Sequence, residues 1–154
     1  MSNPASRLAL LSIGLVIAVL LAACGTSSEP QSQVQTPAPG EVVKTAAGNQ
    51  YRDVTADELK AMMDKKDFFL VDVHIPNQGK LPQLDARIAY NEIADNLDKL
   101  PADKSAKIVL TCMSGGMSTL ASQTLADLGY SNVYNLKGGF NSWRDKGYDF
   151  TPEP

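Results

Sequence analysis

Two runs of apolar residues in the middle of the chain predict buried strands. The runs are Phe68 to Val73 and Lys107 to Thr111, and neither shows the strict alternation of a half-exposed strand. Near-continuous apolar runs of this length are typical of parallel strands that are covered on both faces. Tyr51 to Val54 and Val133 to Leu136 predict two further short strands.

Helical patterns lie between these predicted strands. Thr55-Ala56-Asp57-Glu58 has the spacing of a capping box, which predicts a helix from there to about Lys65. A second helix after residue 115 would have one apolar face. That face would contain Leu120, Ala121, Leu125 and Leu128. The alternation of strands and helices predicts an α/β fold with roughly five short strands.

The first residues have the pattern of an export signal. Arg7 precedes the apolar run Leu8 to Leu21, which is shorter than the roughly 20 residues of a membrane-spanning helix. The next residues, Leu21-Ala22-Ala23-Cys24, resemble the lipobox of bacterial lipoproteins. This resemblance implies a signal peptide over residues 1–23, a lipid on Cys24 and a location on the outer side of the cell membrane. An ordinary signal peptide and a marginal anchor helix are the alternatives.

Residues 24–50 are expected to be the lipidated N-terminus and a disordered tether. From Gly25 onward this segment is rich in Ser, Thr, Gln, Pro and Gly and has few large apolar residues. Such a composition cannot bury enough surface to offset the entropy of an ordered chain. The 154 residues therefore leave room for a single domain, which we place at residues 51–152.

Charge and cysteine content narrow the function further. Cleavage would remove one of the 14 basic side chains and leave 13 against 17 acidic ones, so nucleic acid is not an expected partner. With Cys24 lipidated, Cys112 would be the only free thiol and no internal disulfide could form. His74 is the only histidine, so no metal site is expected.

The lone thiol of Cys112 lies between a predicted strand and a predicted helix. In open α/β sheets ligands commonly bind at this carboxyl end of the strands. The residues that follow form a glycine-containing loop of Met113, Ser114, Gly115, Gly116, Met117 and Ser118. Backbone amides in such a loop can stabilise a thiolate, which is the reactive form of cysteine. The alternative is a buried structural cysteine beside a turn.

Several segments together resemble the rhodanese-like domain, from about Tyr51 to Phe150. The segments are FFLVDVH, IVLTCMSGGMS and LGYSNVYNLKGGFNSWRDKGY, in this order. The last is the most specific, because Lys137-Gly138-Gly139-Phe140 followed by Trp143 resembles the closing turn and helix of that family. The resemblance implies an about five-stranded parallel sheet with helices on both faces.

The resemblance also implies sulfur transfer through Cys112. The thiolate would attack a small sulfur donor, carry the sulfur as a transient persulfide and pass it to a thiol or another thiophilic acceptor. Loop amides from about Met113 to Ser118 would stabilise the anion, and no further cofactor is implied. The expected protein is a membrane-tethered sulfurtransferase or persulfide carrier.

Two methionines depart from the family pattern. Many members have arginine at the position of Met117 and a basic or polar residue at that of Met113, which helps to bind an anionic donor. We therefore expect poor use of thiosulfate. The methionines either favour a softer sulfur donor or fill space in the core.

Four residues upstream of the loop are candidates for the pocket. Lys80 or Arg87 would supply the missing positive charge, although exposed basic residues are usually only solvated. Asp72 is expected to hold backbone or a neighbouring cation, and His74 is either structural or part of the pocket.

Two other functions stay open at this stage. The first is a non-catalytic binding module with the same fold on the cell envelope, favoured by the missing cation. The second is a cysteine phosphatase or an arsenate-reductase-like enzyme, which also uses a cysteine in such a loop. The phosphatase pattern requires arginine six residues after the cysteine, where this chain has Ser118.

Overall fold

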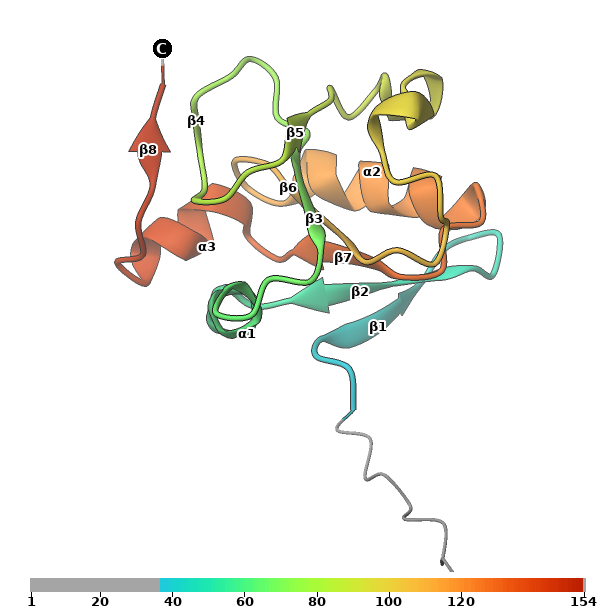
Figure 1. The fold of residues 1–154 in the computed structure, drawn as a ribbon, viewed down its shortest axis with the longest axis horizontal. Coiled ribbons are helices and arrows are strands. Elements are labelled where there is room, and N and C mark those ends of the chain that lie inside the picture. The colour runs from blue at the N-terminus through green and yellow to red at the C-terminus, as the bar shows by residue number, and fades with distance from the viewer. Residues whose placement is uncertain (1–36, 154) are drawn as a thin grey trace, which may run out of the picture. The chain divides into compact units, whose positions relative to one another are not determined.

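Six strands form one sheet in the computed structural model, which describes residues 37–153 (Figure 1). Their order across the sheet is β1-β2-β7-β6-β3-β5. All neighbouring strands are parallel except β1 and β2, which are antiparallel. The strands are β1 (Glu41–Lys44), β2 (Gln50–Val54), β3 (Phe69–Asp72), β5 (Ala86–Arg87), β6 (Ile108–Thr111) and β7 (Val133–Leu136).

Helices cover both faces of this sheet, as predicted. α2 (Gly116–Asp127) packs on one face, and α1 (Ala56–Met63) and α3 (Gly139–Asp145) pack on the other (Figure 1). Two short 3-10 helices, η1 (Ile93–Asp95) and η2 (Leu97–Lys99), lie between β5 and β6 in the sequence. The α/β fold with a mostly parallel sheet is therefore confirmed.

The central strands bury both of their faces. In β3, Val71 contributes to the core under α2, whereas its neighbour Leu70 contributes to the core under α1 and α3. Leu110 and Val109 divide in the same way in β6. Because successive residues of a strand point to opposite faces, a strand between two cores needs apolar residues at every position. This explains the continuous apolar runs in the sequence.

The predicted tether is wrong in its last ten residues. Glu41–Lys44 forms the edge strand β1, which pairs with β2. The hydroxyl of Thr45 donates a hydrogen bond to Asp127 Oδ1 at 2.6 Å, and the amide of Gly40 donates to Glu58 Oε1 at 3.2 Å. The ordered domain therefore begins before Tyr51. The apolar run of this strand consists of only two valines, which is too short to predict a strand within a polar segment.

The other N-terminal predictions lie outside the described residues. They concern the signal peptide at residues 1–23, the lipid on Cys24 and the tether up to residue 36. Within residues 37–153, no helix combines the length and the apolar character that crossing a membrane requires.

The apolar face predicted for the second helix is wrong at two positions. Leu120 is 52% exposed and Leu128 is 37% exposed, whereas Ala121 and Leu125 are buried. Small side chains complete the buried face. The buried residues of α2 are Ser118, Ala121, Ser122, Leu125 and Ala126. This spacing of three and four residues gives one helical stripe, and Leu120 falls outside it.

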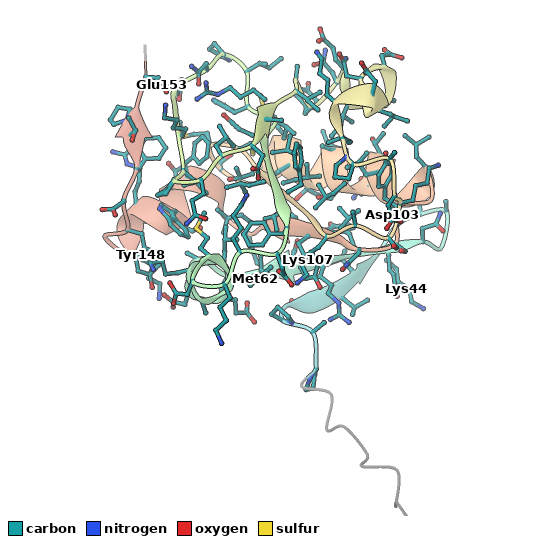
Figure 2. All side chains as sticks on the ribbon, viewed as in Figure 1. Lys44, Met62, Asp103, Lys107, Tyr148 and Glu153 are labelled. Carbon is teal, nitrogen blue, oxygen red and sulfur yellow. The ribbon has the colours of Figure 1, made fainter. Side chains whose placement is uncertain are left out.

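The last strand of the chain belongs to a second, two-stranded sheet. β4 (Gly79–Lys80) pairs antiparallel with β8 (Thr151–Pro152). The pairing places Glu153 beside the segment that connects β3 to β5 (Figure 2).

Candidate active site

Cys112 directly follows β6, and its loop leads into α2 at the carboxyl edge of the sheet (Figure 1). The N-cap of α2 is Gly115, which has a φ of +94°. Glycine adopts this left-handed conformation without the steric cost that a side chain would impose. The loop can therefore turn sharply around the thiol and direct its backbone amides inward.

The sulfur of Cys112 is held by groups of its own loop. Sγ accepts hydrogen bonds from the amide of Gly115 at 3.1 Å and from the amide of Ser118 at 3.4 Å. The Ser118 hydroxyl lies 3.4 Å from Sγ and also donates to the Gly115 carbonyl at 3.1 Å. Because one hydroxyl hydrogen serves one acceptor at a time, it can turn from the carbonyl to a negatively charged sulfur.

The helix adds to this stabilisation of negative charge. α2 has 12 residues, and no side chain of the described residues caps its N-terminus. The amides of the first turn therefore direct their partial positive charge towards the loop. The N-terminus of α2 therefore adds positive potential to the loop that surrounds the Cys112 sulfur.

The turn that contains Gly138 and Gly139 packs against the cysteine loop and holds its backbone in place. The amides of Phe140 and Asn141 donate to the carbonyls of Cys112 and Met113 at 2.8 and 3.0 Å. A Cβ on Gly139 would lie 2.1 Å from the Cys112 carbonyl oxygen, so only glycine fits. The sequence assigned Gly138 and Gly139 to a structural turn, but it did not reveal that this turn holds the cysteine loop.

The two methionines of the loop pack into different cores. Met113 packs against the core under α1 and α3, and Met117 packs against the core under α2. Both side chains are partly buried. This arrangement agrees with the interpretation of the methionines as packing residues.

Three of the predicted pocket residues, Asp72, Lys80 and Arg87, belong to one cluster of ion pairs that is joined by Arg87 and Glu153. Arg87 Nε lies 3.5 Å from Asp72 Oδ2, and Lys80 Nζ lies 2.8 Å from Glu153 Oε1. Arg87 also pairs with Glu153, which sequence analysis did not identify. Lys80, Asn77 and Arg87 lower the pKa of Glu153 to about 2, whereas burial raises the pKa of Asp72.

His74 follows Asp72 on the chain, and its ring makes no hydrogen bond in the described residues. Its backbone amide donates to Asp72 Oδ1 at 3.0 Å, but neither ring nitrogen has a partner. Among residues 37–153, no group of three or more His, Cys, Asp or Glu side chains is arranged to hold a metal ion. Cys112 is a free thiol.

A cysteine in an amide-lined loop, at the carboxyl end of a parallel strand, defines a class of small α/β domains with a cysteine site. The model of the rhodanese-like domain matches residues 55–146. The chain therefore belongs to the rhodanese-like domain family, and the family prediction is confirmed.

Proteins similar to this chain include sulfurtransferases. The thiosulfate sulfurtransferase/rhodanese-like domain-containing protein 3 of Mus musculus is 31% identical over 107 residues, which cover 60% of this chain and 68% of the mouse protein. The thiosulfate sulfurtransferase GlpE of Shewanella oneidensis is 28% identical over 99 residues, which cover 63% of this chain and 96% of GlpE. These similarities place the chain among homologues of sulfurtransferases.

A solved structure has the same fold. The rhodanese-related protein of Thermoplasma volcanium superimposes with a TM-score of 0.56 at 27% identity. The superposition covers 67% of this chain and all of that protein.

Proposed function

We propose that this protein is a membrane-tethered sulfurtransferase or persulfide carrier with Cys112 as its nucleophile. The observation that carries the proposal is the pair of amides, from Gly115 and Ser118, that donate to Sγ at the N-terminus of α2. They stabilise negative charge on the sulfur before and after it accepts a second sulfur atom. Homology to named sulfurtransferases supports the same chemistry.

The reaction has two steps, and each exchanges one bond for another. In the first, the Cys112 thiolate attacks the sulfane sulfur of a donor. A sulfur–sulfur bond forms at Cys112 while the donor's own bond to that sulfur breaks, and the remainder of the donor leaves as an anion. In the second step an acceptor thiolate attacks the outer sulfur, and Cys112 leaves as a thiolate.

The loop favours a donor of low charge. Many family members have arginine at the position of Met117 and a basic or polar residue at that of Met113. In this chain both methionines pack into the two cores. Lys80 and Arg87 are both paired with Glu153. We therefore expect an organic persulfide to load Cys112 faster than the doubly charged thiosulfate, whereas both relatives are named thiosulfate sulfurtransferases.

The tether is proposed from the sequence Leu21-Ala22-Ala23-Cys24. A lipid on Cys24 would hold the domain on the outer face of the cell membrane. Mass analysis of the mature N-terminal peptide checks this part of the proposal, because it reports both the cleavage site and the lipid. An intact Met1 or an unmodified Cys24 would contradict it.

Intact-mass measurement tests the chemistry. The reduced protein is incubated with polysulfide or with thiosulfate, and its mass is measured before and after addition of a thiol acceptor. The expected result is a gain of one sulfur, about 32 Da, that is absent in Cys112→Ser and removed by the acceptor. If the thiol is reduced and no sulfur is gained, the proposal fails.

A non-catalytic binding module is the second candidate function, because the Cys112 residue is only 1% exposed. Complementation separates the two candidates. A Cys112→Ser protein that fully replaces the native protein in the cell would favour the binding module, and loss of function would favour sulfur transfer.

A further inference from the structure

A depression of about 380 Å³ lies beside the cysteine loop, where α2 begins. Its volume is in the range of sites that bind small molecules. β2, β7, the cysteine loop and α2 all contribute to its lining. The lining includes Asp53, Ser114, Gly115, Thr119, Asn135 and Lys137.

Asn135 gives this depression a buried hydrogen-bond acceptor without a partner. The residue is 2% exposed, and its Nδ2 donates to Asp53 Oδ1 at 2.8 Å and to Thr119 Oγ1 at 3.2 Å. These two bonds use both amide hydrogens and fix the orientation of the amide. Among residues 37–153, its Oδ1 has no hydrogen-bond partner. A ligand with an N–H group would satisfy this oxygen.

Two charged side chains of opposite sign line the same depression. Asp53 is half-buried and comes from the end of β2, and Lys137 is exposed just after β7. Lys137 Nζ also lies 3.6 Å from Glu41 Oε2, but both side chains are mostly exposed and such pairs are weak. The depression thus presents a carboxylate to an ammonium group and an ammonium to a carboxylate group, and the buried Asn135 lies in its wall.

The depression and the thiol lie on the same face of the sheet. Asn135 pairs in register with Leu110, and Cys112 is two residues further along the same strand direction. Alternate residues of a strand point to the same face, so Leu110 and Cys112 both face α2, where they share one core. Gly115 connects the two features, because it lines the depression and its amide lies 3.1 Å from Sγ.

We propose that this depression binds the sulfur acceptor, a small thiol with one ammonium and one carboxylate group, as in an amino acid. Asp53, which Asn135 holds in place, binds the ammonium, and Lys137 binds the carboxylate. The acceptor thiolate attacks the outer sulfur of the Cys112 persulfide, a new sulfur–sulfur bond forms, and Cys112 leaves as a thiolate. The step needs no oxidant or reductant. The inference rests on the proposed function, because it assigns the acceptor class of that reaction.

The first test compares two acceptors on the persulfide-loaded, full-length protein in detergent. L-Cysteine has the ammonium group and 3-mercaptopropionate lacks it, so their discharge rates are measured at equal thiolate concentration. In Asp53→Asn we expect the preference for L-cysteine to fall by roughly ten-fold, since a charge-assisted hydrogen bond is lost. Asp98→Asn, an exposed aspartate on η2, is the matched control and should keep the native ratio.

The ratio of the two rates isolates binding from reactivity. The intrinsic nucleophilicity of each thiol is the same for every variant and cancels when ratios are compared. An unchanged ratio in Asp53→Asn would overturn the assignment. Lys137→Gln gives a second arm in case Asp53→Asn folds poorly, because Lys137 is exposed. Its preference for L-cysteine over cysteamine, which lacks the carboxylate, should fall, and an unchanged preference would also overturn the assignment.

Binding without reaction separates this inference from the proposed function. S-methyl-L-cysteine has both charged groups but no thiol, so it cannot accept sulfur. Titration into the full-length, nitrogen-15-labelled protein should shift the side-chain amide resonances of Asn135 and the backbone amide of Gly115. If no persulfide forms but these shifts appear, the proposed function fails and the site stands. If persulfide forms and no shift appears, the acceptor site is contradicted and the proposed function is not.

Discussion

The chemistry of Cys112 depends on backbone groups. Amides of Gly115 and Ser118 donate to its sulfur, and the amide of Phe140 holds its carbonyl oxygen. Main-chain donors in a fixed loop cost no side-chain entropy when they bind an anion. At the residue scale, the glycines that allow these close approaches matter as much as the cysteine.

Gly139→Ala should destabilise the fold more than Gly48→Ala. Both glycines have positive φ, +58° and +88°, but a Cβ on Gly139 would meet the Cys112 carbonyl at 2.1 Å whereas a Cβ on Gly48 meets nothing within 4 Å. We expect Gly48→Ala to cost about 1 kcal/mol and Gly139→Ala roughly 1–3 kcal/mol more. Urea unfolding gives both free energies, and equal losses would show that the backbone moves freely away from the new methyl group.

Ser118→Ala should slow persulfide loading, whereas Ser122→Ala should not. Both serines are completely buried in α2. The Ser118 hydroxyl contacts Sγ and the Gly115 carbonyl, whereas the Ser122 hydroxyl has no partner in the described part of the chain. Loss of one hydrogen bond predicts a rate roughly three- to ten-fold lower for Ser118→Ala. Stopped-flow loading with polysulfide measures the rates. Equal loading rates for the two variants would show that the Ser118 hydroxyl does not contribute to the reaction.

At the scale of elements, the β4–β8 pair ties the C-terminus to the segment between β3 and β5. Glu153 is central to this contact, because it pairs with Lys80 and Arg87 and accepts a hydrogen bond from Asn77. Arg87 in turn lies against Asp72 at the end of β3. These contacts hold two cations in a cluster with the C-terminal strand.

Glu153→Gln should change how stability depends on pH. The pKa of Glu153 is lowered from 4.5 to about 2, so its carboxylate stabilises the folded protein above pH 4.5, and this contribution is lost as the pH falls towards 2. The difference in unfolding free energy between native protein and variant should be largest near pH 6 and vanish near pH 2. Urea unfolding across this range checks the expectation, which a constant difference would contradict.

At the scale of the whole molecule, one sheet joins segments that are far apart in the sequence. β1 and β2 lie at one edge, and β2 pairs with β7, whose residues follow about 80 positions later. The hairpin of β1 and β2 is also tied to the end of α2, because Thr45 and Asn49 donate to Asp127. The edge strand therefore belongs to the domain and does not serve as a linker.

A fragment that begins at residue 37 should be more stable than one that begins at Gln50. The shorter fragment loses β1 and the hydrogen bonds of Gly40 and Thr45, and it exposes the edge of β2. At about 1 kcal/mol each, the two bonds of Gly40 and Thr45 predict a difference of about 2 kcal/mol, to which the lost β1–β2 pairing adds. Thermal and urea unfolding measure it, and identical unfolding midpoints would show that β1 contributes nothing.

The sequence alone predicted the central strands, the order of strands and helices, and the loop that contains Cys112. These features follow from local rules, because a buried strand needs a continuous apolar run and a tight loop needs glycine. The resemblance at Lys137-Gly138-Gly139-Phe140 identified the family for the same reason, since a fixed backbone conformation constrains residues that are close in sequence.

Contacts between residues that are distant in sequence are set by the tertiary structure. Arg87 and Glu153 are 66 positions apart, and Asp53 and Asn135 are 82 positions apart. No local pattern encodes such pairs, because they depend on which strand edges and chain ends are brought together when the sheet closes. For the same reason the sequence predicted a tether where β1 pairs with β2, and a buried Leu120 where small side chains of α2 face the sheet. Local patterns determine the elements, whereas long-range packing determines the surroundings of the thiol.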